Sequence, residues 1–369
     1  MQKNRVLIVA SFPPPVHGSA VVSQFIKDSQ MINESFDCDY VNLSTSRRID
    51  EIGKKTVAKV WRLITALLIV LWNLLTRRYR ICYLAITCHG MGFLKDLPFV
   101  LMCKLFCGNV VIHQHNKGMA SYVDIWPYKW LLPMAYKNVK VILLSWRLYP
   151  DIERLVSREN VCICPNGTPV VEYTYNGKRN EVPRLLFLSN LIESKGVIVL
   201  LDALKILKGK GMSFDCYFVG DETVKLNRVQ FGKEVDTRGL NRIVSYKGRK
   251  LGLDKRDIFR TADIFVFPTF YHDECFPLVL LEAMQYGLPI VTTSEGGIPD
   301  MVENGVNGFI CEKNNPESLA MCLELLLNDE SLRKRMGESG YEKYRNEYTL
   351  ESFEKRLTGI LKSCCRESI

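Results

Sequence analysis

The sequence lacks both glycine-rich fingerprints with which many proteins bind nucleotides. No G-x-G-x-x-G follows the first strand-like run of either half, and no G-x-x-x-x-G-K-[ST] occurs anywhere in the chain. These absences argue against two enzyme classes for this chain, the dinucleotide-dependent dehydrogenases and the P-loop kinases.

Several other signatures are also missing. There is no zinc-finger spacing or arginine-rich arm, and the 13 cysteines form no C-x-x-C pair. We therefore expect reduced cysteines, buried as small hydrophobic side chains in a cytoplasmic protein that does not bind nucleic acid. The opening run MQKNRVLIVASF stops at prolines and is too short for the apolar region of a signal peptide, so we expect no secretion signal.

The composition suits two ordinary domains. The chain has 369 residues, of which 47% are hydrophobic, so it can build a sizeable core in each domain. Its net charge of +9 is compatible with an anionic ligand or an anionic membrane surface.

The most membrane-like segment runs from Lys54 to Arg80 and contains no acidic residue. Its uninterrupted apolar part, from Leu63 to Leu75, is shorter than the roughly 20 residues that span a bilayer. Basic residues flank this part and a tryptophan lies near each end. Three interpretations stay open: a helix packed on a sheet, a helix that also rests on an anionic membrane face, and a true span.

Short β-branched runs alternate with helical stretches, which is the pattern of parallel sheets with crossover helices. A polar segment at 172–184 interrupts the alternation and is typical of a linker. The sequence thus predicts two Rossmann-like sheets that join near residue 170. The predicted strands are 5–12, 37–44, 80–87, 109–115, 140–145 and 160–165 in the first half, and 184–190, 214–221, 242–248, 263–269, 288–293 and 308–312 in the second.

Glu282 is a carboxylate inside an otherwise apolar helix. The helix is expected to begin at Pro277, a good first helical residue, and to end at Gly287. Nearly every other side chain on it is apolar, so Glu282 should be largely buried. A buried carboxylate needs a polar partner, which would be either a protein donor or the hydroxyls of a ligand.

A second acid and a pair of glycines follow neighbouring strands. Glu274 lies just before the same helix, near its free amides, where anions are stabilised, although an ordinary N-terminal acid would do as much. Gly296 and Gly297 form the turn after the next strand, where bare backbone can approach a ligand. Because parallel sheets bind ligands beyond the carboxyl ends of their strands, these residues predict one binding crevice.

The stretch DECFPLVLLEAMQYGLPIVTTSEGGIPDMVENGVNGFI resembles the E-x7-E block of the retaining glycosyltransferases with the GT-B fold, the large group 1 family. Other segments are similar to family motifs in the same order along the chain. PNGTP resembles the interdomain turn, LSNLIESKG the phosphate-binding loop, FPPPVHGSAVV the first glycine-containing loop, and VVIHQHNKG the strand that ends in histidine.

The resemblance implies a nucleotide-sugar donor held mostly by the second half. Glu282 would accept the ribose hydroxyls, Glu274 would lie beside the donor hexose, and Lys195 would pair with the diphosphate. Since the departing nucleoside diphosphate gains negative charge, a fixed cation and backbone amides would lower the barrier. The family typically works without a metal, so we expect no metal and no cofactor. The remaining donor-binding candidates are Gly18, Asn190, Arg249, Phe276, Pro277, Gly296 and Gly297.

In the first half, the resemblance assigns a sugar contact to His115, at the end of its strand. His113, two residues earlier, is expected to be structural. Asn116 and Lys117 would line the acceptor side. His17, beside Gly18, is either an acceptor-side residue or only a loop residue.

Two residues depart from the family pattern. Asn190 stands where the family usually has an arginine, and Arg249 either substitutes for that cation or is an exposed arginine at a strand end. Cys275 replaces the glycine that commonly follows the first acid. Neither change removes the pair formed by Glu274 and Glu282.

The resemblance implies an α/β chain of the GT-B class, with two Rossmann-like domains whose parallel sheets face a central cleft. An acceptor-side domain would cover 1–167 and a nucleotide-sugar-binding domain 168–345, with a helix at about 346–369 packed back on the first.

The expected function is retaining transfer of a hexose or N-acetylhexosamine from a UDP- or GDP-sugar to a glycan or lipid-linked acceptor. It would serve cell-surface polysaccharide synthesis at the cytoplasmic face of the membrane. A glycosidase-type double displacement is less attractive, because a carboxylate committed to ribose cannot also be the general acid. Two alternatives are a degenerate protein that binds sugar nucleotides without turnover and a nucleotide-sugar epimerase of similar fold.

Overall fold

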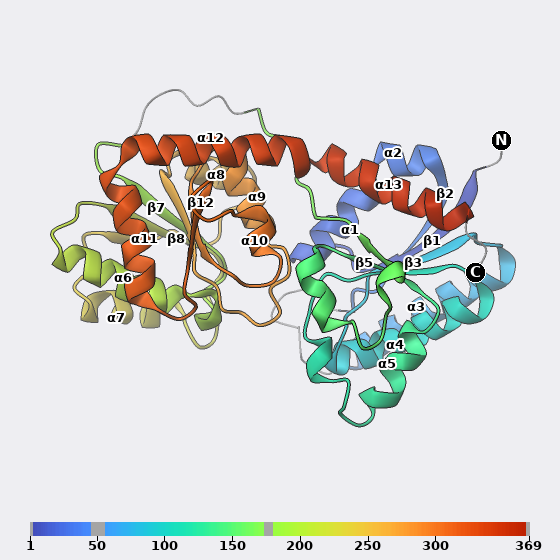
Figure 1. Ribbon diagram of the computed structural model, residues 1–369. Helices are drawn as coiled ribbons and strands as arrows, with labels where there is room; N and C mark the ends of the chain where they lie inside the picture. Colours follow the sequence, from blue (N-terminus) through green and yellow to red (C-terminus); the bar gives the residue numbers. More distant parts are fainter. Residues whose placement is uncertain (1–2, 46–55, 173–179, 367–369) are drawn as a thin grey trace. The chain divides into compact units, whose positions relative to one another are not determined.

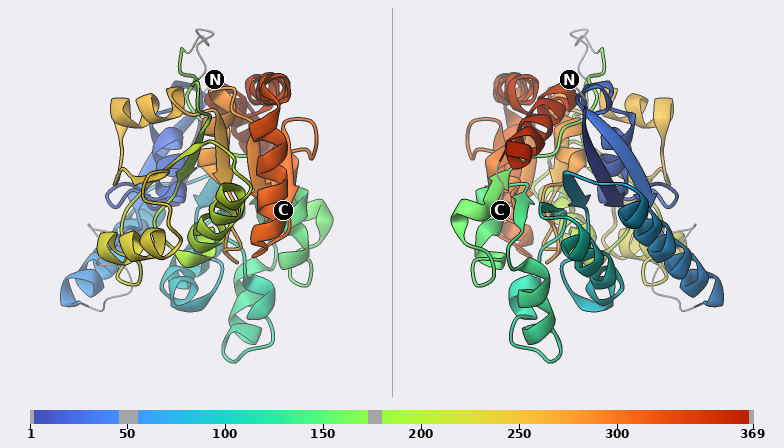
Figure 2. Two further views of the ribbon diagram at one scale, coloured as in Figure 1. Left: turned by 90° about the vertical axis from the view of Figure 1, so that its left-hand side faces the viewer. Right: turned by 90° about the vertical axis from the view of Figure 1, so that its right-hand side faces the viewer.

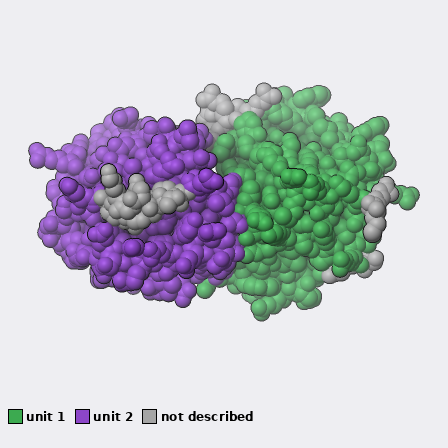
Figure 3. Space-filling model, turned by 90° about the horizontal axis from the view of Figure 1, so that it is seen from above, with its two compact units in different colours: residues 1–167, 350–369 green, residues 168–349 purple. Residues whose placement is uncertain are grey.

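The computed structural model describes residues 3–45, 56–172 and 180–366 (Figure 1). The chain divides into two compact units, coloured separately in Figure 3. Unit 1 comprises Met1–Gly167 and Leu350–Ile369, and unit 2 comprises Thr168–Thr349. The returning segment therefore begins at Leu350 and not at about 346. The reason is local: the Thr168 amide donates to the Tyr348 carbonyl, and Thr168 forms a β-bridge with Thr349, so these residues belong to unit 2.

Unit 1 is a parallel six-stranded sheet in the order β2-β1-β3-β4-β5-β6. The order in which the chain adds strands to the sheet reverses between β1 and β3, which are parallel, hydrogen-bonded neighbours. The strands are β1 (Asn4–Ala10), β2 (Phe36–Asn42), β3 (Ile81–Leu84), β4 (Val110–His113), β5 (Lys140–Leu143) and β6 (Val161–Ile163).

Helices cover both faces of this sheet. Right-handed crossovers place α3, α4 and α5 on one face, since each leads toward β6, and α1 and α2 on the other. Helix α13 packs against α2, and α4 packs against both α3 and α5 (Figures 1 and 2). The helices are α1 (Gly18–Asp28), α2 (Gln30–Ser35), α3 (Val57–Thr76), α4 (Gly90–Phe106), α5 (Tyr128–Tyr136) and α13 (Leu350–Arg366), with short 3-10 turns η2 (Met119–Ser121), η3 (Trp146–Asp151) and η4 (Arg158–Asn160).

Unit 2 repeats the design with the strand order β12-β11-β10-β7-β8-β9. Here the reversal lies between β7 and β10, as in dinucleotide-binding sheets. Its strands are β7 (Arg184–Leu188), β8 (Asp215–Val219), β9 (Val244–Tyr246), β10 (Ile264–Phe267), β11 (Ile290–Thr293) and β12 (Gly308–Cys311). Its helices are α6 (Val197–Gly209), α7 (Arg228–Thr237), α8 (Gly252–Arg260), α9 (Leu278–Gln285), α10 (Ile298–Met301), α11 (Pro316–Asn328) and α12 (Glu330–Glu347), with the turn η5 (Glu193–Lys195).

All twelve predicted strands are confirmed, each shorter than its apolar run. Strands β3, β4, β10 and β11 are buried at every residue, as expected for a sheet covered on both faces. Each buried aliphatic side chain contributes about 1.5–3 kcal/mol relative to its exposed state. The predicted linker at 172–184 and the two lysines at 54 and 55 fall largely or wholly outside the described residues.

Candidate functional site

The switch point of the unit 2 sheet brings Lys195 and Glu274 together. Lys195 lies in η5, after β7, and Glu274 lies in the loop after β10. The Lys195 ammonium forms an ion pair with Glu274 Oε2, and both side chains are largely buried, with 15% and 11% exposure. The ammonium also lies 4.3 Å from the ring centroid of Tyr271. Two of the three expected catalytic side chains thus meet at the predicted end of the sheet.

Gly196 is required where the η5 turn meets the end of β10. Its φ is +88°, and a Cβ atom there would lie 2.3 Å from the carbonyl oxygen of Pro268. A side chain would push the turn away from the strand. The glycine therefore holds Lys195 against the loop that carries Glu274.

Glu282 has one occupied and one unoccupied carboxylate oxygen. Lys255 of α8 donates from Nζ to Glu282 Oε1 at 2.7 Å. Glu282 Oε2 is buried and has no hydrogen-bond partner among the described residues. The prediction of a largely buried side chain is wrong in degree, because 27% of it is exposed. A protein donor therefore meets half of the requirement, and a ligand hydroxyl would meet the other half.

The residues between the two acids serve the core. Helix α9 begins at Leu278, one residue later than predicted, because Pro277 has extended backbone geometry and precedes the first turn. Phe276 is buried, and its ring contacts Tyr348 at a centroid distance of 5.7 Å. Cys275 is also buried. These side chains seat the loop, and any donor contact from this stretch would come through its backbone.

Gly296 and Gly297 pack against the backbone of the loop that carries Glu274. Gly296 has φ +53°, and a Cβ atom there would lie 2.2 Å from the Glu274 carbonyl oxygen. The Gly297 amide donates to the Cys275 carbonyl at 2.7 Å. The bare backbone expected to face a ligand at Gly296 instead faces the protein backbone. Its purpose in this structure is to let two loops touch.

Asn190 and Arg249 meet at an acid that sequence reasoning missed. The Asp221 amide donates to Asn190 Oδ1 at 3.3 Å, and Arg249 Nη1 lies 3.3 Å from Asp221 Oδ2. About a third of the Arg249 side chain is exposed, and so is about a third of Asp221, so the pair contributes little to stability. Arg249 is thus partly neutralised where a second phosphate cation was predicted.

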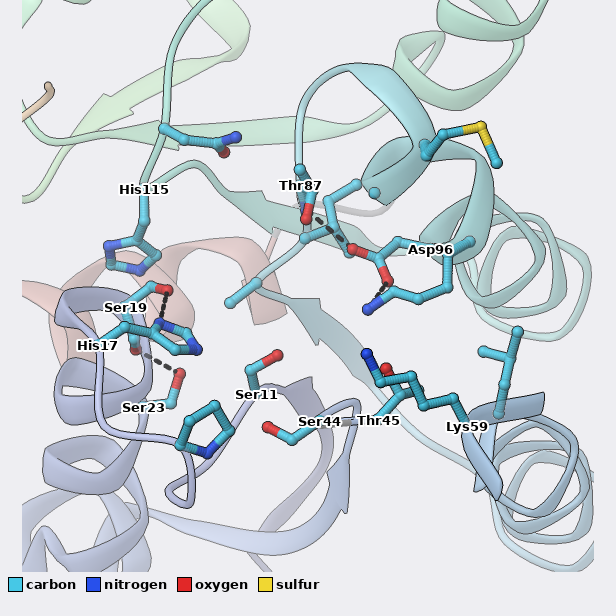
Figure 4. Close-up of a pocket in the computed structure, with 18 of the residues that line it drawn as sticks. Ser11, His17, Ser19, Ser23, Ser44, Thr45, Lys59, Thr87, Asp96 and His115 are labelled. Atoms are coloured by element: carbon cyan, nitrogen blue, oxygen red, sulfur yellow. Dashed lines mark hydrogen bonds and ion pairs between the residues drawn. The ribbon is translucent and has the colours of Figure 1, made fainter. Parts of the chain in front are cut away.

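Unit 1 contains a cavity of about 750 Å³ beyond the carboxyl ends of its strands (Figure 4). His17, His115 and Asn116 line it, and their expected contacts with acceptor and sugar stay predictions. Lys117 and Gly18 are not among its lining residues. Much of the remaining wall carries hydroxyl groups, including those of Ser11, Ser19, Ser23, Ser44, Thr45 and Thr87.

His17 caps helix α1 and also lines the cavity. Its Nδ1 accepts from the Ala20 amide at 3.4 Å, and Gly18 is the first helical residue. Desolvation and then the nearby charge of Lys95 lower the pKa of His17. The side chain is therefore both a helix cap and a largely neutral part of the cavity wall.

His115 follows the end of β4, and its ring contacts that of His113 at a centroid distance of 4.1 Å. His113 is fully buried and bonded to the Tyr83 hydroxyl at 2.6 Å, in keeping with a structural role. Burial, followed by the effect of His17, lowers the pKa of His115 to about 4. Its Nε2 atom is buried without a hydrogen-bond partner among the described residues. His115 therefore presents a neutral imidazole to the cavity (Figure 4).

The charged groups of the cavity were not predicted. Asp96 of α4 is buried, and its Oδ2 accepts from the Thr87 amide at 3.0 Å. Lys95 Nζ lies 3.1 Å from Asp96 Oδ1, and Lys59 of α3 also lines the cavity. No local sequence pattern marks these residues, because the cavity brings together separate loops and helices.

Within 3–45, 56–172 and 180–366, no group of three or more His, Cys, Asp or Glu side chains is arranged to hold a metal ion. The thirteen cysteines are all free thiols, most of them buried. Metal independence itself stays a prediction.

Residues 174–343 match the family model described as glycosyl transferases group 1. The match covers just under half of the chain and lies within unit 2. The matched region contains the E-x7-E pair, Lys195, Asn190, Arg249 and both glycines of the β11 turn. The cavity of unit 1 lies outside it.

Similar proteins agree with this assignment. The capsular polysaccharide biosynthesis glycosyltransferase CapM of Staphylococcus aureus is 28% identical over 198 residues, which are 54% of this chain and 50% of CapM. The chain spans about half the length of the curated relatives it matches.

Solved structures resemble nearly the whole chain. Sucrose-phosphate synthase from Thermosynechococcus elongatus has a TM-score of 0.78 at 14% identity, covering 98% of this chain and 99% of that chain. HepE of Anabaena, solved in complex with UDP, has a TM-score of 0.71 at 15% identity, covering 98% and 100%. The chain therefore has the GT-B fold, with two Rossmann-like units.

Proposed function

We propose that the protein is a retaining glycosyltransferase that moves a hexose or N-acetylhexosamine from a UDP- or GDP-sugar to a glycan or lipid-linked acceptor. The observation that carries this proposal is the buried Lys195–Glu274 ion pair at the switch point of unit 2. The unpartnered Oε2 of Glu282 supports it. So does the name of CapM, a glycosyltransferase of capsular polysaccharide biosynthesis, and we infer a similar role in cell-surface polysaccharide synthesis.

In the proposed complex, the donor exchanges partners with the protein. The diphosphate competes with Glu274 for Lys195, so that the cation turns to the leaving group. Glu274 is thereby released to accept hydroxyls of the hexose and to stabilise positive charge at the anomeric carbon. A preformed cation in a largely buried site stabilises the departing phosphate far better than one in water.

Glu282 would bind the ribose. Its Oε1 is held by Lys255, which fixes the carboxylate, and its Oε2 would accept a ribose hydroxyl. A carboxylate shared between Lys255 and ribose is unsuited to act as a general acid. Retention of configuration is therefore attributed to departure and attack on one face of the sugar, without a covalent enzyme intermediate, as the family pattern implies.

The remaining donor contacts would come from groups at the strand ends. Asn190 and the backbone of the loop that contains Phe276 and Pro277 would line the nucleotide and sugar. Arg249 would reach the phosphates only after leaving Asp221, from which it lies 3.3 Å. Gly296 and Gly297 would act by seating the Glu274 loop.

The acceptor would occupy the unit 1 cavity. Its many hydroxyls suit a carbohydrate, and the neutral imidazole of His115 offers one uncommitted ring nitrogen. His17 and Asn116 would contact the acceptor directly, while Lys117 and Gly18 would contribute from the surrounding loops. We place the reaction at the inner face of the membrane, because α3 carries exposed apolar side chains and no acid.

One observation favours a second candidate, a protein that binds sugar nucleotides without turnover. Asp221 partly neutralises Arg249, and Asn190 supplies no charge, so the diphosphate would be held chiefly by Lys195. A single cation would hold a diphosphate less firmly as a leaving group.

Release of UDP or GDP from a panel of sugar nucleotides tests the proposal. The wild type should release the diphosphate when membrane lipid extract is supplied, and chelation of divalent metals should leave the rate unchanged. Glu274→Gln should lower this release by about 10²–10³-fold. Tight binding without release under any acceptor would favour the binding protein, and a changed donor without acceptor would indicate an epimerase.

A further inference from the structure

The positive charge of the chain is concentrated in one region of unit 1. Residues 54–140 contain 13 lysines and arginines but only two acids, Asp96 and Asp124, a net charge of +11. The rest of the chain has 36 basic and 38 acidic residues, a net charge of −2. This region includes α3, α4 and α5, which cover one face of the sheet (Figure 2).

The five tryptophans are also confined to unit 1, and all of them are exposed. Their exposed fractions are 70% for Trp61, 68% for Trp72, 76% for Trp126, 66% for Trp130 and 42% for Trp146. Such a large aromatic side chain is normally much more buried in a soluble domain. Tryptophan gains most from exposure where its apolar ring meets a lipid interface and its N–H stays hydrated.

Two stripes of exposed apolar side chains run along this face. Helix α3 exposes Trp61, Ile64, Leu68, Trp72 and Leu75, which recur at helical spacing. Only Ala66, Val70 and Leu74 of its twenty residues are buried.

The second stripe follows α5. Trp126, Trp130 and Met134 recur every four residues and are exposed, and Lys129 and Lys137 flank them. Leu105 and Phe106 at the end of α4 are exposed as well. We name the exposed side chains of α3, the end of α4 and α5 the basic aromatic face.

Helix α3 is, in the described part of the chain, the one helix long and apolar enough to cross a membrane, with 20 residues and a mean hydropathy of 1.7. The uninterrupted apolar run in the sequence, Leu63 to Leu75, is shorter than this helix. A span is nevertheless incompatible with the sheet, because β2 and β3, on either side of α3, both pair with β1. A crossing helix would place those two strands on opposite sides of the bilayer. The helix must therefore lie along a surface.

We propose that the basic aromatic face docks on an anionic lipid bilayer, with α3 and α5 in the plane of the interface. Apolar rings would enter the headgroup region while lysines and arginines pair with anionic lipids. The observation that selects a bilayer over a second copy of the chain is charge: two such faces, each from a region of net charge +11, would repel.

The docked face also determines how an acceptor would arrive. Lys59, Val60 and Leu63 of α3 line the unit 1 cavity, so one helix serves both the interface and the cavity wall. If the proposed transfer function holds, the acceptor is an amphiphile anchored in that same bilayer. Its polar head would enter the cavity beside Lys59 and Lys95 while its apolar part stays in the lipid.

Sedimentation and intrinsic fluorescence test the docking without any knowledge of the acceptor. The full chain should sediment with vesicles of phosphatidylglycerol and phosphatidylcholine, much less with phosphatidylcholine alone, and less at high salt. Because every tryptophan belongs to unit 1, its emission should shift to shorter wavelength with the anionic vesicles and be quenched by brominated lipid. Unchanged emission together with absent sedimentation would overturn the proposal.

Charge variants make the test specific to this face. Arg77 pairs with Asp39, and Arg80 donates to the Cys365 carbonyl, so their substitution would disturb unit 1 itself. Arg78→Gln, Lys129→Gln and Lys137→Gln together remove exposed charge and should weaken vesicle binding roughly fivefold for each charge lost. The control triple in unit 2, Lys205→Gln, Lys225→Gln and Lys233→Gln, should bind as the wild type does. Equal weakening by both triples would contradict a docking face.

Two further results separate the remaining explanations. Trp126→Ser with Trp130→Ser should reduce vesicle binding while thermal unfolding stays cooperative. If these variants instead abolish a concentration-dependent dimer and leave vesicle binding intact, the face is a contact between copies. Docking is measured without donor or acceptor, so its failure is distinguishable from failure of the proposed transfer, which is measured by nucleotide release in detergent.

Discussion

The two units share one architecture and differ in the side chains that lie at the carboxyl ends of their strands. At the switch point of unit 2, ion pairs occupy the candidate residues: Lys195 with Glu274, and nearby Lys255 with Glu282. At the corresponding end of unit 1 lies an open cavity lined by hydroxyls and by neutral histidines. The paired charges suit the reacting donor, whereas a wall made mostly of hydroxyls and neutral histidines, with Lys59, Lys95 and Asp96 among them, suits recognition of an acceptor.

The surfaces differ in the same sense. Unit 2 has no tryptophan, and its exposed large apolar side chains in the described residues are aliphatic and scattered, such as Val224, Leu253 and Met321. Unit 1 carries all five tryptophans and the whole excess of positive charge. The difference suggests that chemistry and location are assigned to separate units.

Removing the Glu274 carboxylate from its ion pair in unit 2 should have the largest effect on activity. We expect Glu274→Gln to lower acceptor-dependent nucleotide release by about 10²–10³-fold, the usual cost of losing one electrostatic contact to a transition state. Glu193→Gln, an exposed acid two residues before Lys195, is the matched control and should keep the wild-type rate. Equal losses in both variants would show that the Glu274 carboxylate has no special role.

The neutral histidines of unit 1 should make stability depend on pH. The pKa of His115 is lowered from 6.5 to about 4, so the unfolded chain takes up a proton that the folded chain refuses. The stabilisation is complete above pH 6.5 and is lost as the pH falls toward 4, by up to about 3 kcal/mol.

Urea unfolding between pH 7 and 4 measures this loss. His115→Asn should flatten the pH dependence, leaving the parts that come from His113 and His17, since burial lowers the pKa of both. A curve for His115→Asn that matches the wild type would refute the assignment.

The glycine turn of unit 2 should be intolerant for a steric reason. Gly296→Ala adds backbone strain of about 1–3 kcal/mol at φ +53° and a clash with the Glu274 carbonyl. Gly305→Ala is a matched control, because its φ is +83° and no atom lies within 4 Å of the added Cβ. Chemical denaturation should show a larger loss for Gly296→Ala, and only that variant should also lower nucleotide release.

The ribose contact should give the smallest effect. We expect a 2′-deoxynucleoside diphosphate to bind the wild type about tenfold more weakly than the ribonucleotide, the value of one or two hydrogen bonds. Glu282→Gln should bind the two ligands almost equally. Calorimetric titration gives both affinities, and a full preference for ribose in the variant would place the ribose elsewhere.

The sequence predicted the sheets well because buried parallel strands are continuous apolar runs bounded by turns. It also predicted that Glu274 lies in a loop after a strand and Glu282 in the helix that follows, and the family resemblance added Lys195. It could not predict Lys255 as the partner of Glu282 or Asp221 as the partner of Arg249, since these pairs join segments distant in the chain and no local pattern encodes them. The role of Gly296 was misassigned for a related reason: a glycine signals a close approach, but not what approaches it.

Helix α3 shows the same limit for surfaces. A helix that is apolar on nearly every side has no periodicity to tell its buried side from its exposed side. The sequence shows Trp61 and Trp72 near the ends of the apolar run. It does not show that they are exposed, because that depends on how few residues of α3 pack against the rest of unit 1. The charge asymmetry of 54–140, by contrast, was available from composition alone.

Ligand-dependent thermal unfolding tests the central claim most directly, because any ligand that binds the folded state alone raises its melting temperature. UDP or GDP should stabilise the wild type in proportion to the logarithm of ligand concentration. Lys195→Met should remove most of this stabilisation, because the lysine is proposed to hold the diphosphate. No stabilisation by any nucleoside diphosphate, or an undiminished effect in Lys195→Met, would contradict it.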